Sequence, residues 1–177
     1  MKAFITAVLL CIASSGLHAE SYKSKDWEWG NSGTEYLYAA TTNSTGSSLG
    51  QYCYYESEDC YYLVSLGPNC KKENEYPALI GSDKGAIAVT LICSHKYKGR
   101  SVYMISPFEK IDTLVRQASR VGIAIPLESD SFKVVRFSLS GSTHAISTMR
   151  KTTAAVLKKK NTQSQKPAGN KPDEQYL

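Results

Sequence analysis

The chain has 177 residues, of which 42% are hydrophobic and 21% charged, with a formal net charge of +5. This composition is ordinary for a globular protein and excludes collagen-like, coiled-coil and wholly disordered classes. The small positive charge could favour anionic partners such as envelope surfaces, but a solvated basic surface is the simpler explanation.

Residues 1–19 have the pattern of a secretory signal peptide. Lys2 provides a positive charge, Ala3–Ala13 is apolar, and the small residues before Glu20 resemble a cleavage site. The apolar stretch is shorter than the roughly 20 residues that a membrane-spanning helix needs. We therefore expect an exported protein, periplasmic or secreted, without an integral membrane segment once the signal is cleaved.

The cysteines fit this compartment. Cys11 lies in the apolar part of the signal and is expected to leave with it, so that an even set of four remains. Four cysteines in an exported chain predict two disulfides, and their spacing lacks the C-x-x-C pair that is usual in zinc sites. Three pairings are formally possible. We favour Cys53 with Cys60 and Cys70 with Cys93, and we expect no metal and no other cofactor.

Seven segments read as strands, because aliphatic, aromatic and β-branched residues alternate between turn signals. The second and third form a hairpin around the acidic turn Glu56–Asp59, and Ala86–Ser94 is the clearest buried strand, with Ile87, Val89, Leu91 and Cys93 toward one face. The predicted strands cover residues 35–42, 49–55, 60–66, 86–94, 101–105, 123–127 and 132–139.

Two segments read as helices. Ser106-Pro107-Phe108-Glu109 resembles a capping box with proline at the first helical position, and Gly122 is a plausible residue after the helix end. The apolar face of this helix would comprise Phe108, Ile111, Leu114, Val115 and Ala118. A last helix is predicted over Ser142–Leu157, ended by Lys158–Lys160, with an inward face of Ala145, Ile146, Met149, Thr153 and Val156.

These elements predict an α+β, mainly β, fold: an antiparallel β-sandwich or barrel of about seven strands with two helices. The expected organisation is a signal peptide over 1–19, one disulfide-bonded domain over 20–160, and a disordered basic tail over 161–177, which is rich in Lys, Gln, Pro and Asn.

Tyrosine is the least ordinary feature of the composition. Seven of the twelve tyrosines lie between Tyr36 and Tyr62, and two adjacent pairs occur in the predicted hairpin. Adjacent residues of a strand point to opposite faces, so one member of each pair should be core and the other exposed. Because tyrosine is favoured at recognition surfaces, the candidate binding residues are Tyr52, Tyr54, Tyr55, Tyr61 and Tyr62. Cross-strand packing in a half-buried sheet is the simpler explanation.

Signals for catalysis are poor. His95 and His144 fall on different predicted elements, and a serine near His144 does not by itself make a triad. The carboxylates Glu56, Glu58 and Asp59 cluster in a turn, where solubility and turn chemistry explain them. No catalytic residue is assigned. The predicted strands that carry the tyrosine pairs lack Arg and Lys, which argues against RNA.

Phe137-Ser138-Leu139-Ser140-Gly141 and the following Ser142–Ile146 resemble the closing motif of the invasion-associated locus B family of exported bacterial proteins. Ile125-Pro126-Leu127 and Phe132-Lys133 are similar to that family too. The resemblance implies a periplasmic β-sandwich without established catalytic residues, and a possible association with virulence. We therefore expect a non-catalytic binding or interaction protein of the bacterial envelope, whose partner is a protein or another envelope component. The alternative is a small periplasmic hydrolase or hydrolase inhibitor.

Overall fold

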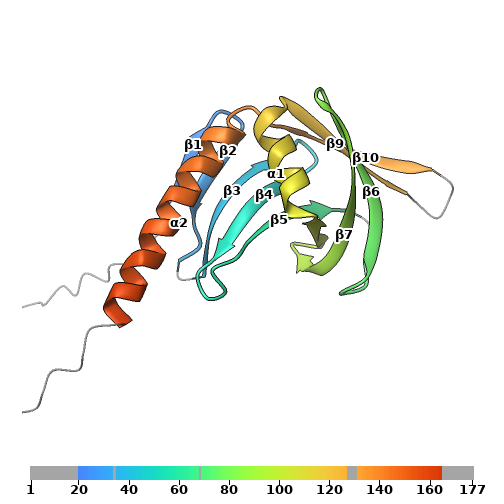
Figure 1. The fold of residues 1–177 in the computed structure, drawn as a ribbon. Coiled ribbons are helices and arrows are strands. Elements are labelled where there is room, and N and C mark those ends of the chain that lie inside the picture. The colour runs from blue at the N-terminus through green and yellow to red at the C-terminus, as the bar shows by residue number, and fades with distance from the viewer. Residues whose placement is uncertain (1–19, 34, 68, 127–130, 165–177) are drawn as a thin grey trace, which may run out of the picture.

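A computed structural model describes residues 20–33, 35–67, 69–126 and 131–164. Ten strands and two helices are present in these residues (Figure 1). In chain order they are β1 (Ser21–Ser24), β2 (Trp27–Asn31), β3 (Tyr36–Thr42), β4 (Ser48–Tyr54), β5 (Cys60–Leu66), β6 (Glu75–Ser82), β7 (Gly85–Tyr97), β8 (Arg100–Ser106), α1 (Phe108–Gln117), β9 (Arg120–Pro126), β10 (Phe132–Ser138) and α2 (Ser142–Ser164).

All ten strands belong to one antiparallel sheet, in the order β1-β2-β3-β4-β5-β8-β7-β6-β9-β10. The mainly β class with two helices is therefore confirmed. The prediction of a sandwich or barrel of about seven strands is confirmed only in part, because the sheet has ten strands, is single and is not closed. The sequence reading missed β1, β2 and β6.

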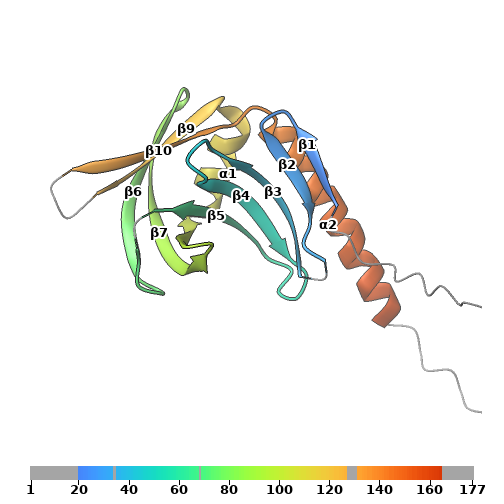
Figure 2. The ribbon, with the colours of Figure 1, turned by 180° about the vertical axis from the view of Figure 1, so that it is seen from behind.

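The sheet curls so strongly that its two ends approach each other (Figures 1 and 2). Trp27 Nε1 donates a hydrogen bond to the Ser138 carbonyl at 3.0 Å, and Asn43 Nδ2 donates one to the Arg136 carbonyl at 3.0 Å. The Ser138 hydroxyl donates to a carboxylate oxygen of Asp26 at 2.6 Å. These bonds tie β10 to the β2 and β3 side of the sheet, although β1 and β10 do not pair.

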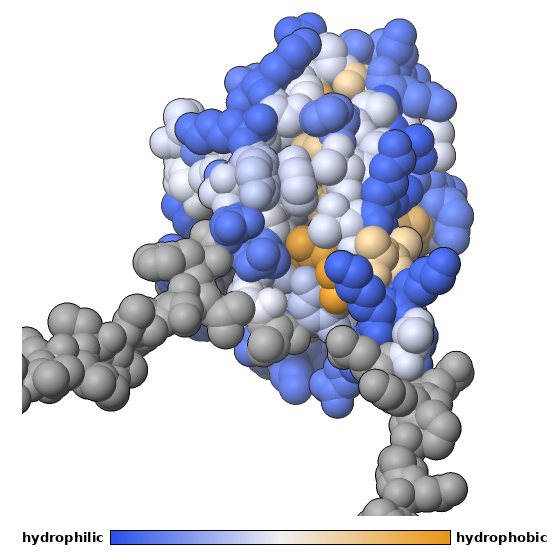
Figure 3. Space-filling view, turned by 90° about the vertical axis from the view of Figure 1, so that its left-hand side faces the viewer, coloured by the Kyte–Doolittle hydropathy of each residue, from blue (hydrophilic) through white to orange (hydrophobic). Residues whose placement is uncertain are grey.

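The core lies on the inner, concave face of this sheet. One hydrophobic cluster contains residues from both halves of the sheet, such as Leu49 of β4 and Ile123 of β9. Helix α1 adds the buried Ile111, Leu114 and Val115. Helix α2 packs on β1–β4 and adds Ala145, Ile146 and Met149, while the side of the molecule that carries α2 is mostly hydrophilic (Figure 3).

Both predicted disulfides, Cys53–Cys60 and Cys70–Cys93, are confirmed, with sequence separations of 7 and 23 residues. Cys53 and Cys60 face each other directly across β4 and β5. Cys70 attaches the segment before β6 to Cys93 on the inner face of β7. Each bridge reduces the conformational freedom of the unfolded chain.

The helix ends differ from the prediction. Ser106 is the last residue of β8, and α1 follows Pro107 without a side-chain cap, so the predicted capping box is wrong. Gly122 lies in β9 rather than after the helix. Helix α2 runs through the three lysines to Ser164, and Val156 is exposed rather than inward. Residues 161–164 are thus helical, and the rest of the predicted tail, like the predicted signal peptide, lies outside the described residues.

The turn after β10 shows why its motif needs glycine. Gly141 has φ +94°, which favours glycine, and a Cβ atom there would lie 1.8 Å from the Ser24 carbonyl oxygen. Phe137 and Leu139, four and two residues earlier, respectively, are both buried in the core. The turn therefore fixes the end of β10 against β1 before α2 begins.

No helix of the described residues is long and apolar enough to span a membrane.

Candidate functional site: an outer tyrosine face

Five tyrosines lie together on the outer, convex face of β3, β4 and β5. The strand register places Tyr36 opposite Tyr54, Tyr38 opposite Tyr52, and Tyr52 opposite Tyr61. Ring centroids of the first two pairs are 5.3 and 6.1 Å apart, within the range of favourable aromatic contacts. We call the surface formed by Tyr36, Tyr38, Tyr52, Tyr54 and Tyr61 the tyrosine face.

Three of the five predicted binding residues, Tyr52, Tyr54 and Tyr61, belong to this face. Tyr62 does not, because its side chain is 0% exposed on the inner side of the sheet. Tyr55 follows the end of β4 and packs half-buried against the core. The expected split of adjacent tyrosines is therefore found for Tyr61 and Tyr62.

Sequence reasoning missed Tyr36 and Tyr38, although both belong to a segment that it predicted as a strand. The signal was the alternation itself. Once that strand pairs with β4, its even-numbered tyrosines must share the outer face with Tyr52 and Tyr54. The sequence did not reveal the register in which the two predicted strands pair, and this register was needed to place Tyr36 and Tyr38.

Burial and neighbouring groups raise the pKa values of several phenols of the tyrosine face. Burial raises the pKa of Tyr52, and the neighbouring tyrosines raise it further. Burial also raises the pKa values of Tyr38 and Tyr54. At physiological pH the face therefore offers uncharged aromatic rings with hydroxyl groups that can donate or accept hydrogen bonds.

Carboxylates flank the tyrosine face. Negative charge on Glu28 and Glu35 contributes to the raised pKa values of Tyr38 and Tyr54, respectively. The Tyr61 hydroxyl donates a hydrogen bond to Asp59 at 3.1 Å, and this bond raises the pKa of Tyr61. An aromatic surface with acids at its margin favours a neutral or cationic partner over an anionic one.

A shallow groove of about 330 Å³ continues the tyrosine face toward β8 and β7. Its floor is formed by Leu63 and Met104, which are opposite each other in the register, and by Ile92. Lys72, Glu73 and His95 stand at its margin. The groove gives the aromatic surface a neighbouring apolar hollow that could take a side chain.

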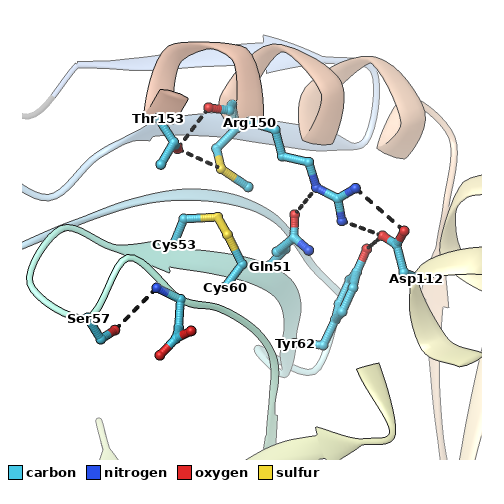
Figure 4. Close-up of a disulfide and its surroundings, with 10 residues drawn as sticks. Gln51, Cys53, Ser57, Cys60, Tyr62, Asp112, Arg150 and Thr153 are labelled. Carbon is cyan, nitrogen blue, oxygen red and sulfur yellow. Dashed lines mark hydrogen bonds and ion pairs between the residues drawn. A yellow bond between two sulfur atoms is a disulfide. The ribbon is translucent and has the colours of Figure 1, made fainter. Parts of the chain in front are cut away.

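A polar network lies on the opposite side of the same strands, between the sheet and the helices (Figure 4). Arg150 of α2 forms an ion pair with Asp112 of α1 at 2.5 Å, and its Nε donates a hydrogen bond to Gln51 Oε1 at 2.8 Å. The Tyr62 hydroxyl donates to Asp112 at 2.8 Å, and burial raises the pKa of this tyrosine. Gln51 Nε2 is the one buried side-chain polar atom of the described residues without a partner.

This network holds β4 and β5 in position from the inner side of the sheet. Removing any one member would leave a partly buried charge or polar group without its bond. Because Gln51 and Tyr62 alternate with residues of the tyrosine face, the network sets the position of the strands that carry that face. We regard these residues as structural support and not as a site.

The other candidates for chemistry remain separate. His95 is exposed on β7 and shares a hydrogen bond of 3.0 Å with Ser94, whereas His144 is exposed in the first turn of α2. The Ser142 hydroxyl is buried and donates to the Val115 carbonyl at 2.7 Å, so it does not face His144. In the described part of the chain, no group of three His, Cys, Asp or Glu residues could hold a metal ion.

Comparison with known proteins supports the fold alone. No protein-family model and no curated protein matches the sequence. Among solved structures, the chain is similar to invasion associated protein b from Bartonella henselae, with a TM-score of 0.56 and 10% sequence identity. The match covers 79% of this chain and 99% of that one. The family resemblance is thus supported at the level of the fold.

Proposed function

We propose that this protein is an exported envelope protein that binds a partner protein through the tyrosine face. The observation that carries the proposal is the gathering of five tyrosines from three strands on one outer surface. Tyrosine provides a large rigid contact area and a polar tip, which suits recognition surfaces. The flanking carboxylates favour a partner whose contacting segment is neutral or cationic.

Two further observations support this proposal. The two disulfides are compatible with an oxidising compartment outside the cytoplasm. The fold is similar to that of invasion associated protein b from Bartonella henselae, and we extend a role at the cell envelope to this chain as a proposal only. No arrangement among residues 20–33, 35–67, 69–126 and 131–164 favours the alternative of a hydrolase.

The test is a capture experiment with purified protein and an envelope extract of the native host. The variant combines Tyr36→Thr, Tyr54→Thr and Tyr61→Thr, because threonine also has a high strand propensity. Tyr22→Thr is the matched control, because Tyr22 is 49% exposed and lies outside the tyrosine face. We expect the triple variant to retain about fivefold less of the captured protein than the wild type, and the control to retain the same amount.

Equal capture by the triple variant and the wild type would contradict the proposal. Capture that is lost with both the triple variant and Tyr22→Thr would point to a general loss of folding, which the unfolding midpoint of each variant checks separately. Capture of glycan alone, with no protein, would also contradict the protein partner.

A further inference from the structure

The free edge of β10 differs from the rest of the sheet. Toward its end, the carbonyls of Arg136 and Ser138 accept hydrogen bonds from Asn43 and Trp27. Even-numbered residues of β10 therefore direct their backbone groups away from β9, since residues of an edge strand alternate in this way. By the same alternation, Phe132 and Val134 direct their N–H and C=O groups to the open side, where no other strand of the described residues pairs with them.

The same end of the hairpin carries exposed apolar side chains. Phe132 is 69% exposed, Leu79 51% and Val134 44%. The register puts Val134, Ala124 and Leu79 in one row across β10, β9 and β6 on the outer face. This row ends at the free edge, where the β9–β10 hairpin projects from the body (Figures 1 and 2). Natural proteins normally protect such an edge, and an apolar exposed edge is a common place for another strand to add.

The charged side chains near this edge indicate which kind of partner strand would bind there. The described residues of β9 and β10 contain Arg120, Lys133 and Arg136 and no carboxylate. Arg120 and Arg136 are exposed and stand on the outer face beside the apolar row, and Asp83, in the turn between β6 and β7, lines the same surface beside Arg120. A second copy of this chain would bring the same three cations to the interface, whereas an acidic segment would neutralise them.

We propose that the open half of β10 is a docking edge for an extended acidic segment of a partner protein, which adds antiparallel to the sheet. The N–H and C=O groups of Val134 both form hydrogen bonds with the partner residue directly opposite. This partner residue is aliphatic and extends the row of Val134, Ala124 and Leu79. Two positions earlier, where the bond from Asn43 to the Arg136 carbonyl closes the edge, the partner strand leaves the sheet and only its acidic side chain reaches Arg136 on the outer face. Two positions later an apolar residue faces Phe132. This edge is independent of the tyrosine face, so that either proposal can fail alone.

The test uses a fluorescent, end-blocked peptide of sequence Thr-Glu-Thr-Val-Thr-Phe-Thr and the same peptide with Lys in place of Glu. Fluorescence anisotropy measures their binding to the intact protein. We expect the Glu peptide to bind about tenfold more tightly than the Lys peptide, with a difference that shrinks as salt increases. Saturable binding of neither peptide, or equal binding of both, would overturn the proposal.

Val134→Pro removes the edge N–H without removing a bond to β9, and Val134→Thr keeps it. We expect Val134→Pro to weaken binding of the Glu peptide about tenfold and Val134→Thr to change it less than about twofold. Arg136→Glu, at an exposed side chain, should reverse the preference between the two peptides even if the proline variant folds poorly. Equal binding to the proline and threonine variants, or an unchanged preference with Arg136→Glu, would contradict the docking edge.

Sedimentation of the protein alone provides the remaining check. We expect a monomer at the concentrations used for anisotropy. A dimer that Val134→Pro converts to monomer would show that a second copy occupies the edge, and would overturn the proposal of an acidic partner segment.

Discussion

The two halves of the sheet expose their outer faces in different ways. In β3–β5 the outer face is covered by tyrosines that contact one another, and the inner face is fixed by α2 and the Arg150 network. In β6, β9 and β10 the outer face carries single aliphatic side chains such as Leu79 and Val134. The first half thus presents a polar aromatic surface with acids beside it, and the second an aliphatic edge with cations beside it.

This difference is the basis of our proposal that one curled sheet carries two surfaces with opposite partner chemistry. The sheet is continuous, so that the distinction comes from the residues on its outer face and from what covers its inner face. Packed positions of the β3–β5 half should therefore be more sensitive to substitution than exposed outer positions of the β6–β10 half. The following predictions use paired substitutions to test this packing.

The largest difference is expected for two leucines. Leu49 of β4 is 0% exposed, whereas Leu79 of β6 is 51% exposed. Leu49→Ala should lower the free energy of unfolding by about 3 kcal/mol, because it leaves a cavity in the core. Leu79→Ala should change it by less than about 0.5 kcal/mol. Urea unfolding followed by circular dichroism measures both, and equal losses would show that the halves are not packed differently.

Arg150→Ala should lower the free energy of unfolding by about 2.5 kcal/mol, since Asp112 and Gln51 lose a partner in a partly buried place. The partial exposure of the pair keeps this loss below that of a fully buried one. Lys151→Ala, at the exposed neighbouring position, is the control. Combining Arg150→Ala with Asp112→Asn should cost less than the sum of the two single losses, and strict additivity would argue against a coupled network.

Two strand glycines provide the third comparison. A Cβ at Gly50 would lie 2.5 Å from the Ala40 Cβ and 2.6 Å from the Ala39 carbonyl oxygen, whereas one at Gly81 meets nothing within 4 Å. Gly50→Ala should therefore destabilise by about 2 kcal/mol, because β3 and β4 would have to move apart. Gly81→Ala should be neutral or stabilising by about 0.5 kcal/mol. Thermal unfolding measures both variants, and a stable Gly50→Ala variant would contradict the close packing of these strands.

The smallest effect concerns Tyr62, whose hydroxyl bonds to Asp112. Tyr62→Phe should lower the free energy of unfolding by about 1 kcal/mol near neutral pH. Folding raises the pKa of Tyr62 above its usual value, so that the folded state holds the proton more tightly than the unfolded state. Its contribution is complete below about pH 10, where unfolded tyrosine begins to ionise, and is lost as the pH rises from there toward the folded pKa.

A pH series of unfolding experiments between pH 8 and the alkaline limit of the fold tests this sign. The wild type should lose stability above about pH 10 more steeply than Tyr62→Phe. Tyr97→Phe, at a tyrosine that is 58% exposed, is the matched control. A Tyr62→Phe variant with the same slope as the wild type would show that this phenol does not contribute to alkaline sensitivity.

The sequence predicted the elements whose patterns are local. The alternation around Ile87–Cys93 predicted β7, and an even cysteine count in an exported chain predicted two bridges. Strand β6 was missed because Pro77 interrupts its pattern. The structure tolerates this proline because β9 pairs with β6 only from Leu79 onward.

The parts that could not be predicted depend on contacts between distant segments. Gln51, Asp112 and Arg150 come from β4, α1 and α2, and no local pattern brings them together. Tyr36 and Tyr38 could join the tyrosine face only once the register of β3 against β4 was known. The curled open sheet also follows from long-range bonds such as that from Trp27 to Ser138.

Photo-crosslinking tests the central claim, that the tyrosine face binds a partner protein, most directly. Tyr61, on the face, and Tyr22, exposed elsewhere, are each replaced by p-benzoylphenylalanine in the protein of the native host. After irradiation, the account predicts a crosslink to a defined envelope protein from position 61 and none to that protein from position 22. No crosslink from position 61, or the same crosslink from both positions, would contradict it.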